Sequence, residues 1–325
     1  MDKGDFVLFS YAIEKNGQGK PLYGKDVQKH VKAKSLGWVH LDAYHDETPE
    51  WLRENVSYLD DTIIDALLAS ETRPRVTFHE KGAMVILRGM NFNQDADPED
   101  MISIRLWIDE SRIISVQRRP LKAVEDIKNA LENGHGPKDS GTFLAMLCGF
   151  LFTRMQPVLS DINEQVDEIE ENILEDSSPE IRQNLGELRK KIIIFKRYIS
   201  PQKDVMAILR NSDLNWLGDN HAKLFQENYD RLTRYIEDFD MVRERSQIIK
   251  EEHMALVSDR MNKNMYSLSI IAGIFLPLGF ITGLLGINVG GMPGVDNENA
   301  FMIVSIACVF CGLGFIGLFK LLKWI

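Results

Sequence analysis

The chain has 325 residues, of which 44% are hydrophobic and 26% are charged, and its formal net charge at pH 7 is −10. This acidic balance argues against nucleic acid as a partner, because proteins that bind the phosphate backbone need a basic surface. A disulfide framework is excluded as well, because the chain has only three cysteines.

Residues 1–140 have the pattern of a mixed α/β domain. Strands are predicted by six runs that are rich in Val, Ile, Phe and Trp and are separated by polar residues or glycine. These runs are FVLFSYAI, GWVHLDA, RVTFHE, AMVILRGM, ISIRLWID and RIISVQRR. Helices are expected at 49–56 and 60–69, and the short gaps at 80–82 and 109–111 predict antiparallel hairpins between the later strands.

The segment 141–264 has a helical pattern. A helix is predicted over 142–176, because apolar residues recur there at spacings of three and four. Ser178 as N-cap and Pro179 at the first helical position then predict a return helix, and so an antiparallel helical hairpin. The outer face of the first helix is acidic, and is either a solvated face or a surface that gathers cations. Its acids are Asp161, Glu164, Asp167, Glu168, Glu170 and Glu171.

A much longer helix is expected after this hairpin. The sequence has no glycine or proline between Gly218 and Gly273, and apolar residues continue a helical period through most of this stretch. These residues are Leu224, Leu232, Ile236, Phe239, Val242, Ile249 and Leu256. A single helix here would be about 80 Å long at 1.5 Å per residue. Such a pattern indicates a coiled coil, a helical bundle or a helix that enters a membrane, and the apolar run that follows favours the membrane.

Two charge-poor segments near the C-terminal end, 265–285 and 300–322, are long enough to cross the hydrocarbon core of a bilayer. Buried helices of a soluble core are the weaker alternative, because two adjacent segments of this length exceed what such a core needs. The connection 286–299 contains acids but no Lys or Arg, whereas basic residues flank the other ends, including the tail 323–325. The positive-inside rule therefore predicts both termini in the cytoplasm, in agreement with the absence of a secretory signal.

Two helices per chain cannot enclose a polar path, so a conducting protein must be an oligomer in which one helix per subunit lines the axis. The first segment is the better candidate, because it continues the long helix and is rich in small residues. Small residues also permit close helix packing in lipid, which is the alternative explanation. The candidate pore-lining stripe is Met265, Leu268, Ala272, Leu276, Gly279 and Gly283. A pore with so little charge would pass hydrated ions and gate by narrowing or dewetting.

The residues Gly286, Ile287 and Asn288 follow the first segment and lead into VGGMPG. This run resembles the signature of the CorA superfamily of divalent-cation channels and transporters, whose usual tripeptide is Gly-Met-Asn. The variant with isoleucine is similar to the ZntB branch, which is associated with zinc. Two further segments fit the same family, ETRPRV at 71–76 and RYISP at 197–201. The order of the predicted parts fits it too, so that the resemblance covers essentially the whole chain.

The resemblance implies an α+β cytoplasmic domain, a long helical bundle and two C-terminal transmembrane helices, assembled as a homopentameric funnel in the bacterial cytoplasmic (inner) membrane. It places a ring of Asn288 at the periplasmic entrance, where the amide oxygen would bind water around a hydrated divalent cation. Gly286 would let the chain turn there. Taken alone, Asn288 is better explained as a helix C-cap or turn residue. Isoleucine in place of methionine favours zinc over magnesium.

Acidic residues near both mouths are candidates for attracting cations. They are Asp296 and Glu298 in the outer loop, and Glu251, Glu252 and Asp259, beside His253, at the cytoplasmic end. The alternatives are ordinary solvated loop acids and the polar face of a bundle helix. His40 and His45 form a weaker candidate for a regulatory zinc site, since the sequence has no Cys/His cage of the structural kind. Cys308 and Cys311 are expected to pack as small apolar residues, rather than to form a redox or metal motif.

The sequence therefore predicts a transporter of divalent cations that prefers zinc, works in the lipid bilayer and has no cofactor other than the transported ion. The membrane potential or a proton gradient would drive uptake; neither segment has an ionisable group before Lys320, so proton coupling would fall to the funnel acids or histidine. Two alternatives remain: a magnesium or cobalt channel of the CorA type, and a membrane-anchored sensor or scaffold. No catalytic constellation appears, so an enzyme is not expected.

Overall fold

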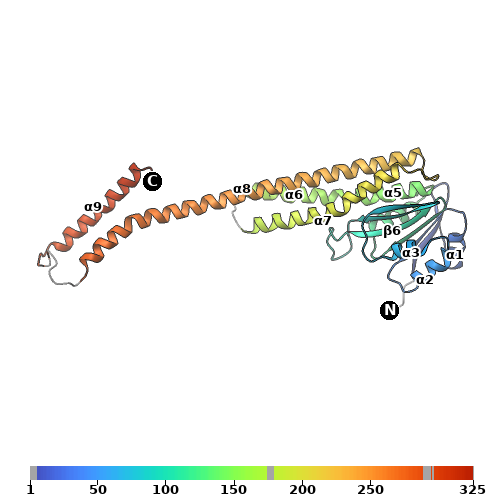
Figure 1. Ribbon diagram of the computed structural model, residues 1–325, viewed down its shortest axis with the longest axis horizontal. Helices are drawn as coiled ribbons and strands as arrows, with labels where there is room; N and C mark the ends of the chain where they lie inside the picture. Colours follow the sequence, from blue (N-terminus) through green and yellow to red (C-terminus); the bar gives the residue numbers. More distant parts are fainter. Residues whose placement is uncertain (1–5, 174–178, 288–293, 295, 325) are drawn as a thin grey trace. The chain divides into compact units, whose positions relative to one another are not determined.

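The computed structural model describes residues 6–173, 179–287, 294 and 296–324. The chain divides into two compact units, Met1–Ile249 and Lys250–Ile325 (Figure 1). The helices of the second unit are the end of α8 and the whole of α9, and every strand and every other described helix belongs to the first unit.

A seven-stranded sheet with the order β2-β1-β3-β7-β6-β5-β4 forms the centre of the first unit. Its strands are β1 Val7–Ile13, β2 Gly19–Pro21, β3 Gly37–Asp42, β4 Arg75–His79, β5 Gly82–Gly89, β6 Ile102–Asp109 and β7 Arg112–Gln117. Neighbouring strands are antiparallel except β3 and β7, which are parallel. All six predicted strands and both predicted hairpins are confirmed. The short strand β2 was not predicted, because Gly-Lys-Pro carries none of the β-branched or aromatic residues that mark a strand.

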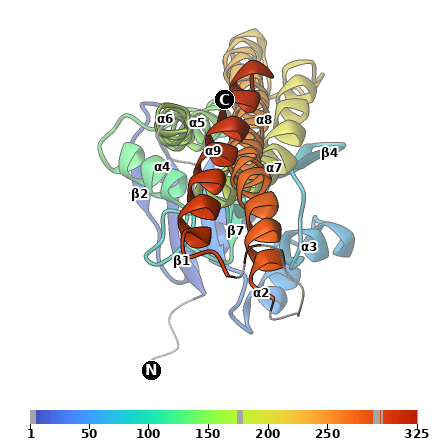
Figure 2. The same ribbon diagram turned by 90° about the vertical axis from the view of Figure 1, so that its left-hand side faces the viewer.

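Helices cover both faces of the sheet, so that strands β5, β6 and β7 are buried on both sides (Figure 2). The helices α1 Lys25–Lys32, α2 Thr48–Asn55 and α3 Asp61–Leu68 bury one face, against a core that includes Leu41, Ile86, Trp107 and Val116. The helices α4 Lys122–Glu132 and α5 Ser140–Thr153 lie on the other face, where Phe143 meets Trp38 edge-on with 4.9 Å between ring centroids. The helices predicted at 49–56 and 60–69 correspond to α2 and α3. Helix α1 was missed, because only Val27 and Val31 mark its apolar side.

The helix predicted over 142–176 is wrong in one respect, because the structure divides it into α5 and α6 Gln156–Asn172. Pro157 occupies the first turn of α6, where a residue without an N–H is tolerated. Arg154 lies at the junction and forms a bidentate ion pair with Asp126 of α4, with distances of 2.6 and 2.7 Å. This ion pair fixes the junction between α5 and α6 to helix α4. The periodicity of apolar residues cannot predict such a contact.

The remaining helices are α7 Pro179–Arg210, α8 Asp219–Leu285 and α9 Ala300–Leu321. Helix α7 begins at Pro179 as predicted, whereas Ser178 lies outside the described residues. The unbroken long helix is confirmed, since α8 has 67 residues. Its predicted apolar stripe is confirmed at Leu232, Phe239, Val242 and Ile249, which are buried. Leu224 was wrongly included: its side chain is 38% exposed, and the adjacent Phe225 is buried instead.

His40 lies deep in the sheet rather than at a metal site. Its side chain is fully buried, its Nδ1 is 2.6 Å from the Ser115 hydroxyl, and its ring stacks on Phe9 at 4.8 Å. Within the described ranges no group of three His, Cys, Asp or Glu side chains could hold a metal ion. The structure therefore does not support a zinc site at His40 and His45. Burial lowers the pKa of His40 to about 4, because the charged imidazolium loses its hydration.

We expect the first unit to lose stability as the pH falls from about 6.5 towards 4. In this window the unfolded chain takes up a proton at His40 and the folded chain does not, so the free energy of unfolding falls by at most about 1.4 kcal/mol per pH unit. Replacing His40 with Phe should reduce the pH dependence of the melting temperature. His135→Gln, at an exposed position, is the control. Equal slopes for His40→Phe and the unmodified protein would contradict the expectation.

Candidate functional site

Three helical stretches are long and apolar enough to cross a membrane, by length and composition. One of them, Ser140–Asn172, has half of its apolar window buried inside the structure, and its α5 portion packs on the sheet. The apolar windows of α8 and α9 have no buried share within the described residues. The membrane assignment therefore fits the end of α8 and α9, and Ser140–Asn172 belongs to the packed core of the first unit.

Large apolar side chains project from α8 and α9 with nothing in the described chain to cover them. Phe280 is 72% exposed and Phe301 is 86% exposed. Further examples on both helices are Leu268, Ile271, Phe275, Leu276, Val309, Phe310, Leu313 and Leu321. Monomeric soluble proteins rarely expose so much contiguous apolar surface. Lipid, further copies of the chain, or both must cover it.

Helix α9 approaches α8 through glycines. A Cβ added at Gly273 would lie 2.8 Å from Cζ of Phe319, so the ring occupies the space that a larger residue would need. A Cβ added at Gly312 would lie 3.7 Å from Leu278. Close approach of helices at small residues is typical of membrane proteins. The sequence shows that the first apolar segment is rich in small residues, but it gives no signal that Phe319 packs against Gly273.

The predicted pore-lining stripe does not coincide with this contact. Met265, Leu268 and Leu276 are exposed, and Ala272 is half-buried. Gly279 and Gly283 are also exposed, and a Cβ added at either would have no described atom within 4 Å. Apart from Ala272, the stripe is therefore left uncovered by the described part of its own chain, as a surface that faces other subunits or an axis would be.

Helix α8 ends at Leu285, directly before the signature residues. The N–H of Gly286 donates to the carbonyl oxygen of Gly283 over 3.2 Å, which closes the last turn. Ile287 is 47% exposed. Asn288 lies outside the described residues, so its role as a ring residue stays a prediction. Helix α9 follows from Ala300 onward.

The acids of the outer connection, Asp296 and Glu298, are both exposed. At the other end of the apolar run, Glu251, Glu252 and Asp259 are exposed as well. Glu252 and Asp259 are seven residues apart and therefore lie on the same side of α8.

His253 differs from the acids with which the sequence analysis grouped it. It is buried, and its Nε2 has no hydrogen-bond partner among the described residues. The histidine therefore does not share the exposed surface of Glu252 and Asp259. The prediction that it contributes to the cytoplasmic mouth finds no support in this arrangement.

The acidic face of α6 is partly occupied by α8. Arg245 contacts the carboxylate of Asp167 at 2.7 Å and also contacts Glu170. These two carboxylates raise the pKa of Arg245. The other four acids of this face are exposed, namely Asp161, Glu164, Glu168 and Glu171. Part of the face thus holds the helical hairpin against α8, and the rest is open to solvent.

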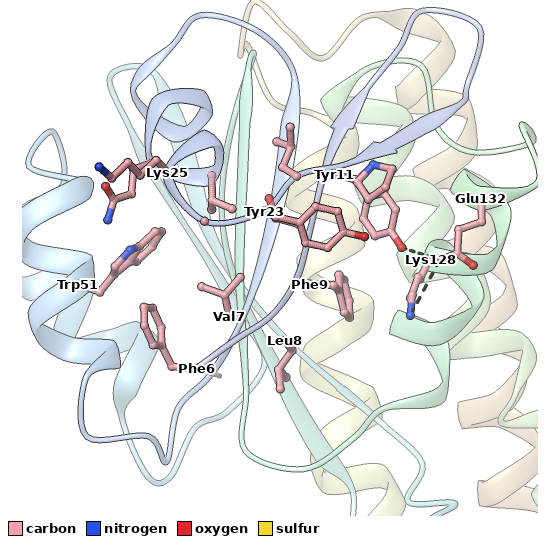
Figure 3. Close-up of a pocket in the computed structure, with 16 residues that line it drawn as sticks. Phe6, Val7, Leu8, Phe9, Tyr11, Tyr23, Lys25, Trp51, Lys128 and Glu132 are labelled. Atoms are coloured by element: carbon pink, nitrogen blue, oxygen red, sulfur yellow. Dashed lines mark hydrogen bonds and ion pairs between the residues drawn. The ribbon is translucent and has the colours of Figure 1, made fainter. Parts of the chain in front are cut away.

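A separate cavity of about 710 Å³ lies beside β1 and α1 in the first unit (Figure 3). Its lining includes Phe9 and Tyr11 near Lys128 and Glu132, with Phe6 and Trp51 at the other end. Glu132 accepts a hydrogen bond of 2.5 Å from Tyr11 and lies 3.9 Å from Lys128. Among the described lining residues it is the only carboxylate, and because it is already paired, the cavity offers little to a metal cation.

The fold, the two apolar helices and the signature loop together allow comparison with known proteins. The family described as CorA-like Mg2+ transporter protein matches residues 33–321. The chain belongs to this CorA family. The predicted resemblance is thereby confirmed, and it extends over both units of the CorA-family chain.

Individual relatives match the CorA-family chain over nearly its full length. It is 38% identical to the divalent cation transporter CmaX of Pseudomonas aeruginosa, over 94% of this chain and 92% of the relative. It is 34% identical to the zinc transport protein ZntB of Yersinia enterocolitica, over 98% of this chain and 96% of the relative. The predicted similarity to the ZntB branch is confirmed by the second match.

Solved structures confirm the predicted fold class. The structure of the full-length CmaX protein matches with a TM-score of 0.84 and 34% identity, over 99% of this chain and 100% of that chain. The CorA magnesium transporter from Methanocaldococcus jannaschii matches with a TM-score of 0.81 over the same shares, at 18% identity. At 18% identity, the match to the Methanocaldococcus jannaschii structure shows a shared fold only. An α/β domain followed by long helices and two C-terminal apolar helices is therefore the architecture of this CorA-family chain.

Proposed function

We propose that this protein transports divalent cations, preferentially zinc, across the bacterial cytoplasmic (inner) membrane as a homopentamer. The observation that carries the proposal is the match to a zinc transport protein and to a divalent cation transporter, at 34% and 38% identity over nearly the whole chain. Both apolar helices and the signature residues 286–288 lie within the family match. Transport uses these parts directly, whereas a tethered sensor or scaffold would leave the signature loop without a purpose.

In the proposed assembly the end of α8 from each of five copies lines a common axis. The uncovered stripe that includes Leu268, Leu276 and Gly283 supports this arrangement, because α9 packs elsewhere, against Gly273. A wall of apolar and glycine residues binds no bare ion, so the cation would pass with its water. A ring of Asn288 would then form the entrance, where amide oxygens accept hydrogen bonds from that water.

Acids at both ends of the path would raise the local concentration of cations. Asp296 and Glu298 would do so at the periplasmic side, and Glu251, Glu252 and Asp259 at the cytoplasmic side; the exposure of all five supports this role. The orientation follows from the basic residues that flank the apolar segments, which favour both termini in the cytoplasm.

The experiment that tests the proposal is zinc flux into liposomes that contain the purified protein, with magnesium and cobalt measured in parallel. We expect zinc flux to exceed magnesium flux, and an imposed proton gradient reports whether transport is proton-coupled. Flux of magnesium or cobalt without zinc would favour a CorA-type channel. Absence of flux for every ion would favour a membrane-anchored sensor or scaffold.

A further inference from the structure

Three arginines share one face of the sheet: Arg88 near the end of β5, Arg105 in the middle of β6 and Arg118 directly after β7. Arg105 of β6 lies between its register partners, Ile86 of β5 and Val116 of β7. Arg88 is two residues beyond Ile86, and Arg118 is two residues beyond Val116. Because side chains alternate between the faces of a strand, all three arginines lie on the side that α1, α2 and α3 cover. No pattern in the sequence predicts a role for any of them.

Arg105 is buried without a partner. Its side chain has 0% exposure, and its Nε, Nη1 and Nη2 atoms have no hydrogen-bond partner in the described part of the chain. The same holds for the buried Nε of Arg118 and the buried hydroxyl of Thr72. Most buried polar groups in proteins are hydrogen-bonded, and an unpaired buried charge is costly. Every one of these unpaired atoms can donate a hydrogen bond.

The bonds that the other two arginines do make are to neutral carbonyl oxygens. Arg88 donates to Thr72 over 2.9 and 3.2 Å and to Met101 over 2.6 Å, and Arg118 donates to Leu68 over 2.8 Å. Among the described residues no carboxylate forms an ion pair with Arg88, Arg105 or Arg118. These carbonyls orient Arg88 and Arg118 but carry no negative charge, and the other contact of each guanidinium is with an aromatic ring, Tyr198 for Arg88 and Tyr44 for Arg118.

The charge is present at neutral pH. Burial, together with the positive charges of Arg118 and Arg88, lowers the pKa of Arg105 to about 10, so that the guanidinium stays protonated at pH 7. Arg88 is also half-buried, and its pKa is lowered mainly by burial. Glu71, an exposed residue, is the carboxylate whose charge acts on Arg88. Three positively charged guanidinium groups therefore lie close together with little negative charge nearby.

We propose that Arg88, Arg105 and Arg118 form a binding site for a phosphate group, either free phosphate or the terminal group of a phosphate ester. Guanidinium groups present planar forks of N–H donors that match the oxygens of phosphate and bind them strongly. A doubly charged, tetrahedral acceptor suits several converging donors better than a single carboxylate does. Arg105 forms the floor of the site, and the half-buried Arg88 and Arg118 form its rim.

The site is connected to the helical part of the first unit through Arg88. The backbone N–H of Arg88 donates to Oε1 of Gln202 in α7 over 2.8 Å, and its guanidinium lies 4.2 Å from the ring centroid of Tyr198 in the same helix. A phosphate that draws the guanidinium inward would change its contact with Tyr198 of α7. Through this contact between Arg88 and α7, a bound anion could regulate the protein. The proposed phosphate site does not depend on the transport proposal.

The test is the melting temperature of the full-length protein in detergent, measured against inorganic phosphate at constant ionic strength. We expect a saturable rise for the unmodified protein, because a ligand that binds the folded state stabilises it. Arg105→Met should lose the rise and should be at least as stable as the unmodified protein without phosphate, since it removes an unpaired buried charge. The control Arg119→Met, at the exposed neighbouring position, should keep the rise.

Two further measurements complete the test. Arg118→Gln changes a residue at the rim and should weaken phosphate binding even if Arg105→Met fails to fold. Phosphorus NMR with inorganic phosphate and with glycerol phosphate distinguishes a free anion from an ester, because only the bound compound should show protein-dependent line broadening that Arg118→Gln reduces. The proposal would be overturned if the unmodified protein showed no saturable response, or if Arg105→Met and Arg118→Gln both responded as strongly as the unmodified protein.

Discussion

Replacement of Asn288 by alanine is expected to reduce zinc flux into liposomes by about ten- to a hundredfold, because the amide oxygen accepts hydrogen bonds from water polarised by the cation, and such charge-assisted bonds contribute about 1.5–3 kcal/mol. In the proposed pentamer the substitution removes the amide oxygen from all five subunits at once. The cation then meets a ring of methyl groups, which accept no hydrogen bond from its water. Flux is measured with a zinc-sensitive dye trapped inside the liposomes.

The control for this substitution is Asn299→Ala. Asn299 lies in the same connection, is exposed, and its side chain makes no cap hydrogen bond to α9. Zinc flux through the control should stay close to that of the unmodified protein. Light scattering in detergent should give the same subunit number for all three proteins, so that a loss of flux reports on the entrance and not on assembly. Unchanged flux in Asn288→Ala would remove Asn288 from the pore.

Replacement of Phe239 by alanine is expected to destabilise the first unit by about 3–5 kcal/mol, which is the usual range for a buried phenylalanine. Phe239 in α8 is fully buried and stacks on Phe195 of α7, with 5.5 Å between ring centroids and 21° between ring planes. The substitution leaves a cavity between the two helices and removes the aromatic contact. The expected result is a lower melting temperature of the full-length protein, and a lower yield of folded protein from cells.

The matched control is Met241→Ala on the same helix. Met241 is 55% exposed, so its truncation removes little buried surface and should change the melting temperature much less. If Phe239→Ala and Met241→Ala melt at the same temperature, the stacked pair does not hold α7 and α8 together, and the stability of this part must come from other contacts.

Much of the fold could be predicted because its elements carry strong local patterns. Strands β5, β6 and β7 are runs of branched apolar residues, and the absence of glycine and proline before Gly273 predicts the unbroken helix α8. Elements without such patterns were missed, as β2 and α1 were. The division between α5 and α6 depends on the contact of Arg154 with a distant residue, so periodicity could not reveal it. The boundaries predicted at residues 140 and 264 remain predictions.

The candidate sites differ in how far the sequence could predict them. Asn288 was predicted from the signature and the stripe of α8 from its residue spacing, and both remain predictions. Arg105 could not be found, because in ISIRLWID it alternates with Ile104 and Leu106 and therefore resembles a residue on a solvated face. Only the register of three strands and the helices on both faces reveal that this arginine is buried next to two others.

The order of the two units along the chain has a consequence for biosynthesis. Ribosomes add about 5–20 residues per second, and domains generally fold as units in the order in which they are made. Met1–Ile249 is complete before the apolar end of α8 is translated. The first and last strands along the chain, β1 and β7, both lie within the first half of this unit. The sheet, whose last strand ends at Gln117, therefore has about 7–30 s in which to fold before the apolar segment at 265 is made, so that each subunit reaches the membrane with its sheet already formed.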